Sequence, residues 1–138
     1  MKKLLPLLVI ALALVACNKE ATYKKALDGT WEAYKYVFRN ADRTAQFKSD
    51  FPGYSITFTE AGTFSESYVS GPDSVRADGT YAFSDNTTKI TLTSTGYKLV
   101  DTTLVPYDMK RVYSIFNLTA SHVQLRNDSS ELYLRKLE

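Results

Sequence analysis

From residue 29 onward, apolar and polar residues alternate in short segments that are separated by residues typical of turns. Alternation with a period of two places the apolar side chains of a β-strand on one face. The pattern predicts eight strands, at residues 29–39, 54–59, 63–69, 79–84, 88–94, 110–118, 122–126 and 131–137. Short strands joined by short turns are typical of an antiparallel sandwich or barrel, and closure into an up-and-down eight-stranded β-barrel leaves no exposed edge.

The connections between these strands differ in regularity. Residues 40–53 form a polar link that contains Phe47 and Phe51, and we expect a lid or a short helix there. Residues 70–78 are rich in Gly, Pro and Asp and are predicted to be a loop. Within the irregular stretch 96–109, residues 97–105 are predicted either to form an extra strand or to extend the fifth one, and Pro106 is expected to end it.

The sixth predicted strand, at residues 110–118, has its own alternation. Val112, Ser114, Phe116 and Leu118 recur at every second position. We therefore expect this set to form the inward face of the strand.

Residues 1–16 have the features of a signal peptide and are excluded from the fold. A basic head, Met1-Lys2-Lys3, precedes an apolar run that ends at Ala16. The run is shorter than the roughly 20 residues of a transmembrane helix. The whole chain has 17 basic and 15 acidic residues, and two of the lysines lie in this head, so the rest is balanced. A balanced chain argues against a nucleic-acid partner.

The sequence Leu14-Val15-Ala16-Cys17 resembles a bacterial lipobox, in which the cysteine is acylated, palmitate being one such acyl chain, and becomes the mature N-terminus. Several acyl chains on one residue give stable membrane anchoring. By resemblance to the sorting rules of enterobacterial lipoproteins, an Asp directly after the cysteine would indicate retention at the inner membrane. Asn18 occupies that position here, so we expect attachment to the outer membrane. The domain could face either the periplasm or the outside. Residues 17–28 are predicted to be a lipidated tether that ends in a short helical turn, and residues 29–138 the domain.

The residue types needed for most chemistry are scarce. Cys17 is the only cysteine and His122 the only histidine, which excludes internal disulfides, a Cys/His dyad and a multi-His zinc site. Motifs for a nucleophile elbow, a phosphate-binding loop or a zinc protease are absent from the sequence. We therefore expect no enzyme activity, no cofactor and no metal.

A more specific pattern begins the first strand. Gly29-Thr30-Trp31 after a short helical turn resembles the opening motif of lipocalins, and the hairpin sequences at 56–64, 79–81 and 131–136 resemble those of lipocalin-like bacterial lipoproteins. The resemblance implies a β-barrel whose closed end is plugged by Trp31, with Arg135 of the last strand packed across the indole. It also implies a cavity, although this chain is shorter than full-length lipocalins.

Lys35 leaves two alternatives open. Simple alternation from Trp31 places Lys35 inside the barrel, where it would have to meet an anionic group. A β-bulge after Trp31 would instead turn Tyr34 and Tyr36 inward and leave Lys35 in water.

The chain contains 10 tyrosines, whose rings and hydroxyls suit a ligand that is mainly apolar. The function expected from the sequence is binding of a small hydrophobic molecule for carriage or sequestration at the cell envelope, without catalysis. The alternative is a filled barrel that holds a partner protein or a glycan through its loops. The candidate ligand-binding residues are Trp31, Lys35, Tyr36, Tyr54, Phe58, Tyr68, Tyr81, Phe83, Tyr97 and Tyr113.

Overall fold

The computed structural model describes residues 19–138, apart from the side chains at positions 96–99 and 104. The predicted signal peptide and Cys17 lie outside the described residues. A helix at residues 19–27 precedes the sheet, where only one helical turn was expected. The remaining elements are β1 (Gly29–Phe38), β2 (Ala41–Asp42), α2 (Thr44–Asp50), β3 (Ser55–Phe58), β4 (Thr63–Ser70), β5 (Asp73–Ser84), β6 (Lys89–Val100), β7 (Thr103–Phe116), β8 (His122–Arg126) and β9 (Ser130–Lys136).

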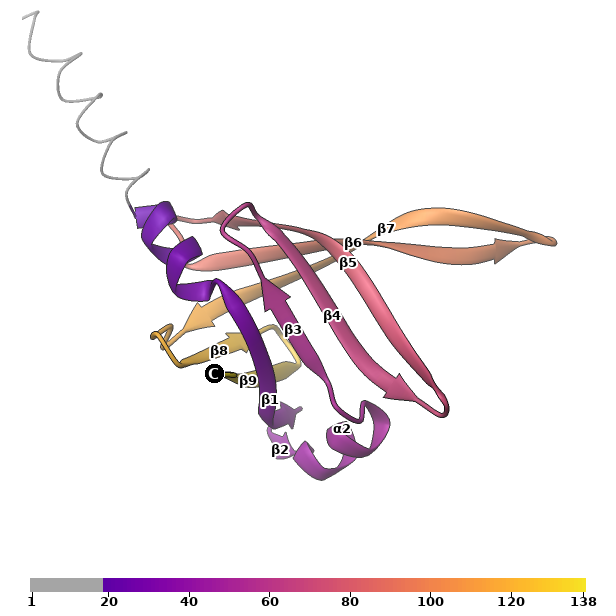
Figure 1. Ribbon diagram of the computed structural model, residues 1–138, viewed down its shortest axis with the longest axis horizontal. Helices are drawn as coiled ribbons and strands as arrows, with labels where there is room; N and C mark the ends of the chain where they lie inside the picture. Colours follow the sequence, from indigo (N-terminus) through magenta and orange to yellow (C-terminus); the bar gives the residue numbers. More distant parts are fainter. Residues whose placement is uncertain (1–18) are drawn as a thin grey trace, which may run out of the picture.

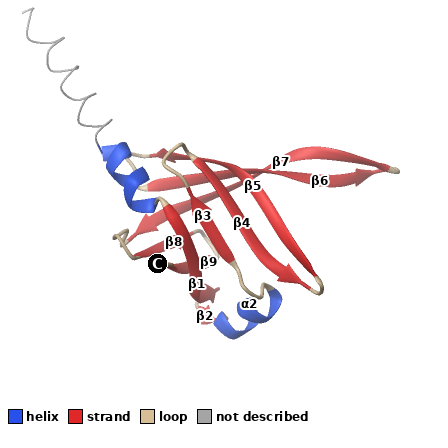
Figure 2. Cartoon of the chain, in the orientation of Figure 1, coloured by secondary structure: helices blue, strands red, loops and turns tan. Residues whose placement is uncertain are grey.

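The strands form a closed antiparallel barrel (Figures 1 and 2). Consecutive strands pair from β3 through to β9, and β1 closes the barrel by pairing with both β3 and β9. The two-residue strand β2 pairs only with the end of β1. The predicted barrel of eight strands is thus confirmed, and the 40–53 link contains the short helix α2.

The loop predicted at residues 70–78 is mostly strand instead, whereas the extension predicted as one alternative for the fifth strand is present. Most of residues 70–78 belong to β4 and β5, which pair from Thr63↔Thr80 to Ser70↔Asp73. Gly71, with a φ of 62°, lies in the tight turn between them, a conformation that glycine adopts without steric cost. Residues 96–109 extend both β6 and β7, and Pro106 pairs with Tyr97 within the ladder instead of ending it.

The extension of β6 and β7 projects from the barrel as a two-stranded arm, residues 95–108 (Figure 1). The β5–β6 pairing begins at Gly79↔Ser94, and β8 pairs with β7 only at residues 114–116. Both long edges of the arm therefore lack a neighbouring strand among the described residues. Pro106 is tolerated there because an edge strand needs no hydrogen bond on its outer side.

One end of the barrel, here called the filled end, is packed solid. The helix at 19–27 lies across it (Figure 1), and Leu27 and Trp31 are 1% and 0% exposed. The indole Nε1 donates a hydrogen bond of 2.7 Å to the carbonyl of Leu27, which ties the helix to β1. The buried apolar core consists of Leu27, Trp31, Ile56, Phe58, Phe64, Tyr81, Ile90, Leu92, Val123, Leu125, Leu132 and Leu134.

The basic residue across Trp31 is Lys136, and the expectation of Arg135 is wrong. In the pairing of β1 with β9, Trp31 lies opposite Lys136 and Glu32 lies opposite Arg135. The Lys136 Nζ lies 5.0 Å from the centre of the indole and donates to the carbonyl of Ala26 near the end of the helix. Arg135 faces outward and forms an ion pair with Glu32, because Leu132 and Leu134 occupy the inward phase of β9.

The inward face predicted for the sixth strand is also wrong. Val112 and Phe116 are 50% and 43% exposed, whereas Arg111 and Tyr113 are partly buried. Arg111 pairs with buried Leu92 of β6, which fixes this phase as the inward one. Apolar residues occur on both faces of β7, so alternation alone did not identify the inner face.

Within residues 19–138, no helix is both long enough and apolar enough to cross a bilayer.

Candidate ligand-binding site

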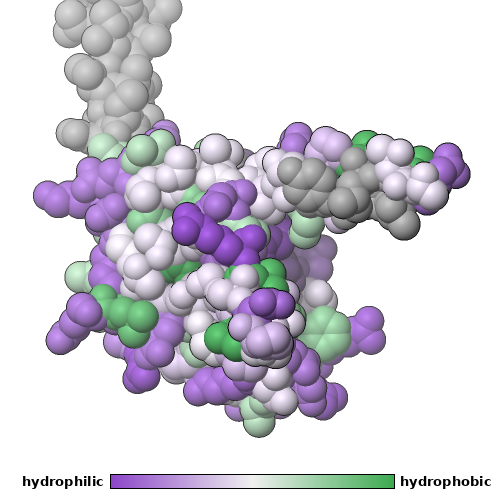
Figure 3. All heavy atoms as spheres, turned by 45° about the vertical axis from the view of Figure 1, so that its right-hand side comes forward, coloured by the Kyte–Doolittle hydropathy of each residue, from purple (hydrophilic) through white to green (hydrophobic). Residues whose placement is uncertain are grey.

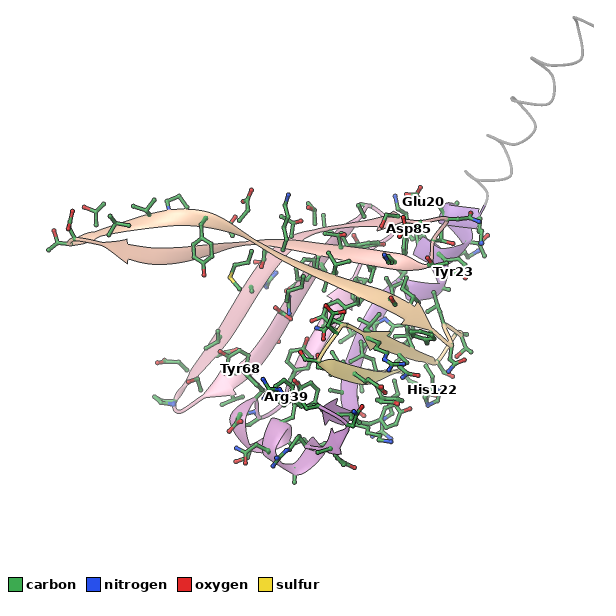
Figure 4. All side chains as sticks on the ribbon, turned by 180° about the vertical axis from the view of Figure 1, so that it is seen from behind. Glu20, Tyr23, Arg39, Tyr68, Asp85 and His122 are labelled. Carbon is green, nitrogen blue, oxygen red and sulfur yellow. The ribbon has the colours of Figure 1, made fainter. Side chains whose placement is uncertain are left out.

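The opposite end of the barrel, here called the cavity end, encloses a hollow of about 250 Å³ beneath α2. Aromatic side chains dominate its wall. The lining residues are Tyr36, Phe47, Phe51, Tyr54, Glu66, Tyr68, Arg111, Tyr113, Ser130 and Leu132. Figure 4 labels Tyr68 near α2, and Tyr23, a residue of the helix at 19–27, at the other end. The barrel is thus filled in one half and hollow in the other, which suits a single small ligand.

Residues of α2 and the segment after it cover the mouth of the cavity. The Phe47 ring lies 4.8 Å from the Tyr36 ring and 5.2 Å from the Tyr54 ring, between centres. Phe51 meets Tyr68 edge to face at 5.1 Å. None of the residues of α2 is buried, so these ring contacts hold a helix that has little core of its own. Elements with few buried contacts open at low free-energy cost.

α2 is fixed at its first turn by hydrogen bonds with β1 and β2. The Tyr36 amide donates to Thr44 Oγ1 at 3.0 Å, and the Thr44 amide donates to the Asp42 carboxylate at 2.9 Å. After the helix, the Val69 amide donates to the Pro52 carbonyl at 2.8 Å. The covering segment is therefore tied at both ends to the barrel, while its middle rests only on aromatic rings.

An ion pair lies at the floor of the cavity. Arg111 donates to both carboxylate oxygens of Glu66, from Nη2 at 2.6 Å and from Nη1 at 3.2 Å. The Tyr54 hydroxyl donates to the same carboxylate at 2.9 Å. The Arg111 guanidinium carbon lies 5.9 Å from the centre of the Phe64 ring, so the pair rests on the top of the filled half. Bidentate Arg–carboxylate geometry is strong and directional.

Burial shifts the ionisation of the groups around this pair. Burial, followed by the negative charge of Glu66, raises the pKa of Tyr54 well above its usual value. Burial likewise raises the pKa of Tyr113, although the charge of Arg111 opposes the shift. For Arg111, burial alone would lower the pKa, but the hydrogen bonds and charge of Glu66 outweigh it and the pKa is raised. The tyrosines are therefore neutral and Arg111 is charged at physiological pH.

The structure brings four of the candidate ligand-binding residues together at this cavity: Tyr36, Tyr54, Tyr68 and Tyr113. Four others belong to the filled half. Trp31 and Phe58 are core residues, the Tyr81 hydroxyl donates to the Thr59 carbonyl at 2.7 Å, and Phe83 packs against Tyr81. The side chain of Tyr97 lies outside the described residues.

Lys35 lies on the outer face of the barrel, so its prediction as an inward ligand-binding residue is wrong. The register between β1 and β9 shifts between Ala33 and Lys35, so a β-bulge at Tyr34 reverses the phase. Lys35 then lies over the outward-facing Tyr133, with Nζ 4.9 Å from the ring centre. The bulge turns Tyr36 inward, as that alternative predicts, but Tyr34 itself is 37% exposed.

Glu66 and Arg111 were not among the residues selected from the sequence. Glu66 lies between Phe64 and Tyr68 at alternate positions of β4, so its inward direction was readable from the strand pattern. The pairing with Arg111 was not readable, because the two residues are 45 positions apart and on strands that are not neighbours in the sheet.

Two other hollows have fewer aromatic residues in their linings. One of about 610 Å³ lies on the outer surface between β6 and the β8–β9 turn, and its lining includes Lys89, Arg126 and Asp128. Another of about 500 Å³ lies on the other side of Phe47 and Phe51. The two phenylalanines therefore separate the cavity from an outer hollow beside α2.

Within residues 19–138, no group of three or more His, Cys, Asp or Glu side chains is placed to hold a metal ion. His122, the only histidine, is exposed and hydrogen-bonded to Ser121 Oγ at 2.9 Å.

Comparison with known proteins identifies the fold alone. No family model and no curated protein matches the chain. Among solved structures, the chain is similar to a lipocalin-like protein from Bacteroides uniformis ATCC 8492, with a TM-score of 0.57 and 15% identity over 81% of this chain and 99% of that one. It is also similar to an uncharacterized protein from Bacteroides eggerthii DSM 20697, with a TM-score of 0.56 and 14% identity over 80% and 99%. The chain therefore has a lipocalin-like β-barrel fold.

Proposed function

We propose that this protein binds a small, mainly apolar molecule in the cavity end of its barrel and performs no chemistry on it. The observation that carries the proposal is the hollow of about 250 Å³ lined by aromatic rings, with one polar group of residues at its floor. Concave, apolar sites with a few placed polar groups are typical of small-molecule binding. Phe47 and Phe51 would swing with α2 to admit the ligand.

The proposed location is the cell envelope, with acyl chains on Cys17 anchoring the protein in the outer membrane. The described helix begins at residue 19 and crosses the filled end (Figure 1). Two residues span no more than about 7 Å, so an anchor at Cys17 would hold the filled end against the membrane. The cavity end would then face away from the bilayer, where it would take its ligand from the aqueous side.

Native mass spectrometry of the full chain released from the membranes of its own cells tests the binding proposal. The expected result is a discrete added mass, beyond the acyl anchor, that disappears when the protein is denatured. Replacement of Cys17 by Ser is the companion variant, and it should abolish membrane attachment without removing the ligand. A polypeptide that carries only the anchor, even when it is released gently, would contradict carriage of a small molecule.

A second candidate function, binding of a partner protein, rests on the arm. Its described side chains include exposed apolar ones, with Val100, Val105 and Tyr107 exposed by 45%, 36% and 42%, and Figure 3 shows hydrophobic residues on this projection. Free strand edges accept a further strand from a partner. Replacement of residues 96–107 by Asn-Gly, which joins the paired residues Thr95 and Asp108, should abolish a protein complex formed through the arm and leave ligand binding intact.

A further inference from the structure

The ion pair at the floor of the cavity limits the charge of the ligand. Among the residues that line the cavity, Arg111 and Glu66 are the charged ones, and their charges cancel. Their side chains are 31% and 14% exposed. Glu66 accepts three hydrogen bonds, two from Arg111 and one from Tyr54. Three of the roughly four acceptor positions of the carboxylate are therefore occupied, and its counterion is Arg111.

A charged ligand would have to disturb this pair. A carboxylate placed near Arg111 would lie beside Glu66, and the two negative charges would repel each other at a site that is only partly exposed to solvent. Displacement of Glu66 by the ligand would strand a carboxylate within the barrel, which costs much more than a surface charge. A cation would meet the same difficulty with Arg111.

The guanidinium still has capacity to donate. A guanidinium has five N–H groups, and Glu66 takes two of them. The Nε atom has no hydrogen-bond partner among the described residues but is inaccessible to solvent. The donors open to a ligand are therefore the remaining N–H groups of Nη1 and Nη2. Tyr54 donates its proton to Glu66, and its raised pKa keeps that proton in place. The floor of the cavity is thus electrically neutral, and Arg111 keeps N–H groups that Glu66 does not use.

Building on the proposed function, we propose that the cavity takes a neutral, flat and largely apolar molecule that carries one hydrogen-bond-accepting oxygen, and that it discriminates against the corresponding carboxylate. The rings of Tyr36, Phe47 and Tyr68 pack against the apolar body, and Arg111 donates to the oxygen. Glu66 sets the discrimination, because it neutralises Arg111 before any ligand arrives.

Three probes of similar shape test the proposal: 2-acetylnaphthalene, which is a neutral ketone, 2-naphthoate, which is an anion, and 2-ethylnaphthalene, which has no acceptor. Each is titrated calorimetrically into the full-length protein in lipid nanodiscs at neutral pH, with protein-free nanodiscs as the blank. The ketone should bind at least about tenfold more tightly than naphthoate and about five- to tenfold more tightly than the ethyl compound.

The variant Glu66→Gln keeps the shape of the side chain but leaves Arg111 without its counterion. The order of affinities should reverse, with naphthoate binding at least about tenfold more tightly than to the unchanged protein. Glu32→Gln is the matched control, because Glu32 pairs with Arg135 on the outer surface of the barrel. In that control, the order of the three probes should stay as it is in the unchanged protein.

The outcomes separate this inference from the proposed function. Naphthoate binding to the unchanged protein as tightly as the ketone, or more tightly, would overturn the neutral-ligand proposal and leave the small-molecule function standing. No measurable binding of any probe would contradict both. The comparison of probes in the unchanged protein decides the question even if Glu66→Gln fails to fold, which circular dichroism would reveal.

Discussion

The two ends of the barrel are built from the same strands but are packed differently. β1 contributes fully buried Trp31 to the filled end and Tyr36 to the cavity end. β4 contributes Phe64, which is 2% exposed, to the filled end and Glu66 to the cavity. The difference assigns the packed core to one half of the barrel and the proposed binding site to the other. Destabilising changes should therefore cluster at the filled end, and changes in affinity at the cavity end.

The largest expected loss of stability is that of Trp31→Ala. The substitution removes a fully buried indole and its hydrogen bond to Leu27, and deletion of a large core side chain costs about 3–5 kcal/mol. Urea unfolding followed by circular dichroism measures the loss, since Trp31 is the only tryptophan and its fluorescence is removed with it. Tyr34→Ala, on the outer surface, is the control and should change stability by less than about 0.5 kcal/mol. An equal loss of unfolding free energy in Trp31→Ala and Tyr34→Ala would contradict the structural role of the filled end.

A smaller loss is expected for Arg111→Met, which leaves Glu66 without its counterion inside the barrel. Because both side chains are partly exposed, we expect about 2 kcal/mol, less than for a fully buried pair. The double variant Arg111→Met with Glu66→Met should recover more than half of that loss, because no unpaired charge remains. A double variant that is less stable than either single one would show that the ion pair itself stabilises the fold.

Alkaline pH should weaken the filled end through Tyr81. Burial, followed by the charges of Asp28 and Glu60, raises the pKa of Tyr81 to about 12 from an unfolded value near 10. The folded protein then binds the proton more tightly than the unfolded one, so the contribution is complete below pH 10 and declines as pH rises toward 12. Tyr81→Phe should flatten this decline in urea unfolding measured at successive pH values. Identical slopes for the two proteins would contradict the assignment.

The smallest change in stability is expected for Phe47→Ala. Phe47 belongs to a helix without buried residues, so its removal should cost less than about 1 kcal/mol. The same change removes the ring between Tyr36 and Tyr54 and should weaken binding of 2-acetylnaphthalene about tenfold. If Phe47→Ala lost much stability but bound 2-acetylnaphthalene with unchanged affinity, the assignment of binding to the cavity end would be contradicted.

The filled end was more accessible to sequence analysis than the cavity end. Regular alternation and turn residues predicted the strands, and Gly29-Thr30-Trp31 indicated the plug. Arg135 was assigned to the wrong face although Leu132 and Leu134 on either side of it are apolar, a pattern that places it outside. The same alternation places the next residue, Lys136, on the inward face opposite Trp31.

At the cavity end, the decisive contacts depend on three-dimensional closure. Tyr36, Tyr54, Tyr68 and Tyr113 line the cavity, as four of the candidates from the sequence. The phase of β1 was not predictable, because a bulge at Tyr34 reverses it and no local pattern fixes the position of that bulge. Arg111 lies where β7 leaves the barrel and continues as the arm, with apolar residues on both faces. Its pairing with Glu66 arises only when the barrel closes around both strands.

Hydrogen–deuterium exchange of the full-length protein, with and without 2-acetylnaphthalene, tests the division between the two ends most directly. The account predicts that the probe slows amide exchange in peptides that cover residues 44–54, 66–68 and 111–113, which surround the cavity. Peptides that cover residues 27–33 and 56–64, at the filled end, should exchange slowly whether or not the probe is present. Slower amide exchange only in the arm or around Trp31, or no change in exchange at a saturating concentration of the probe, would contradict this division between the two ends.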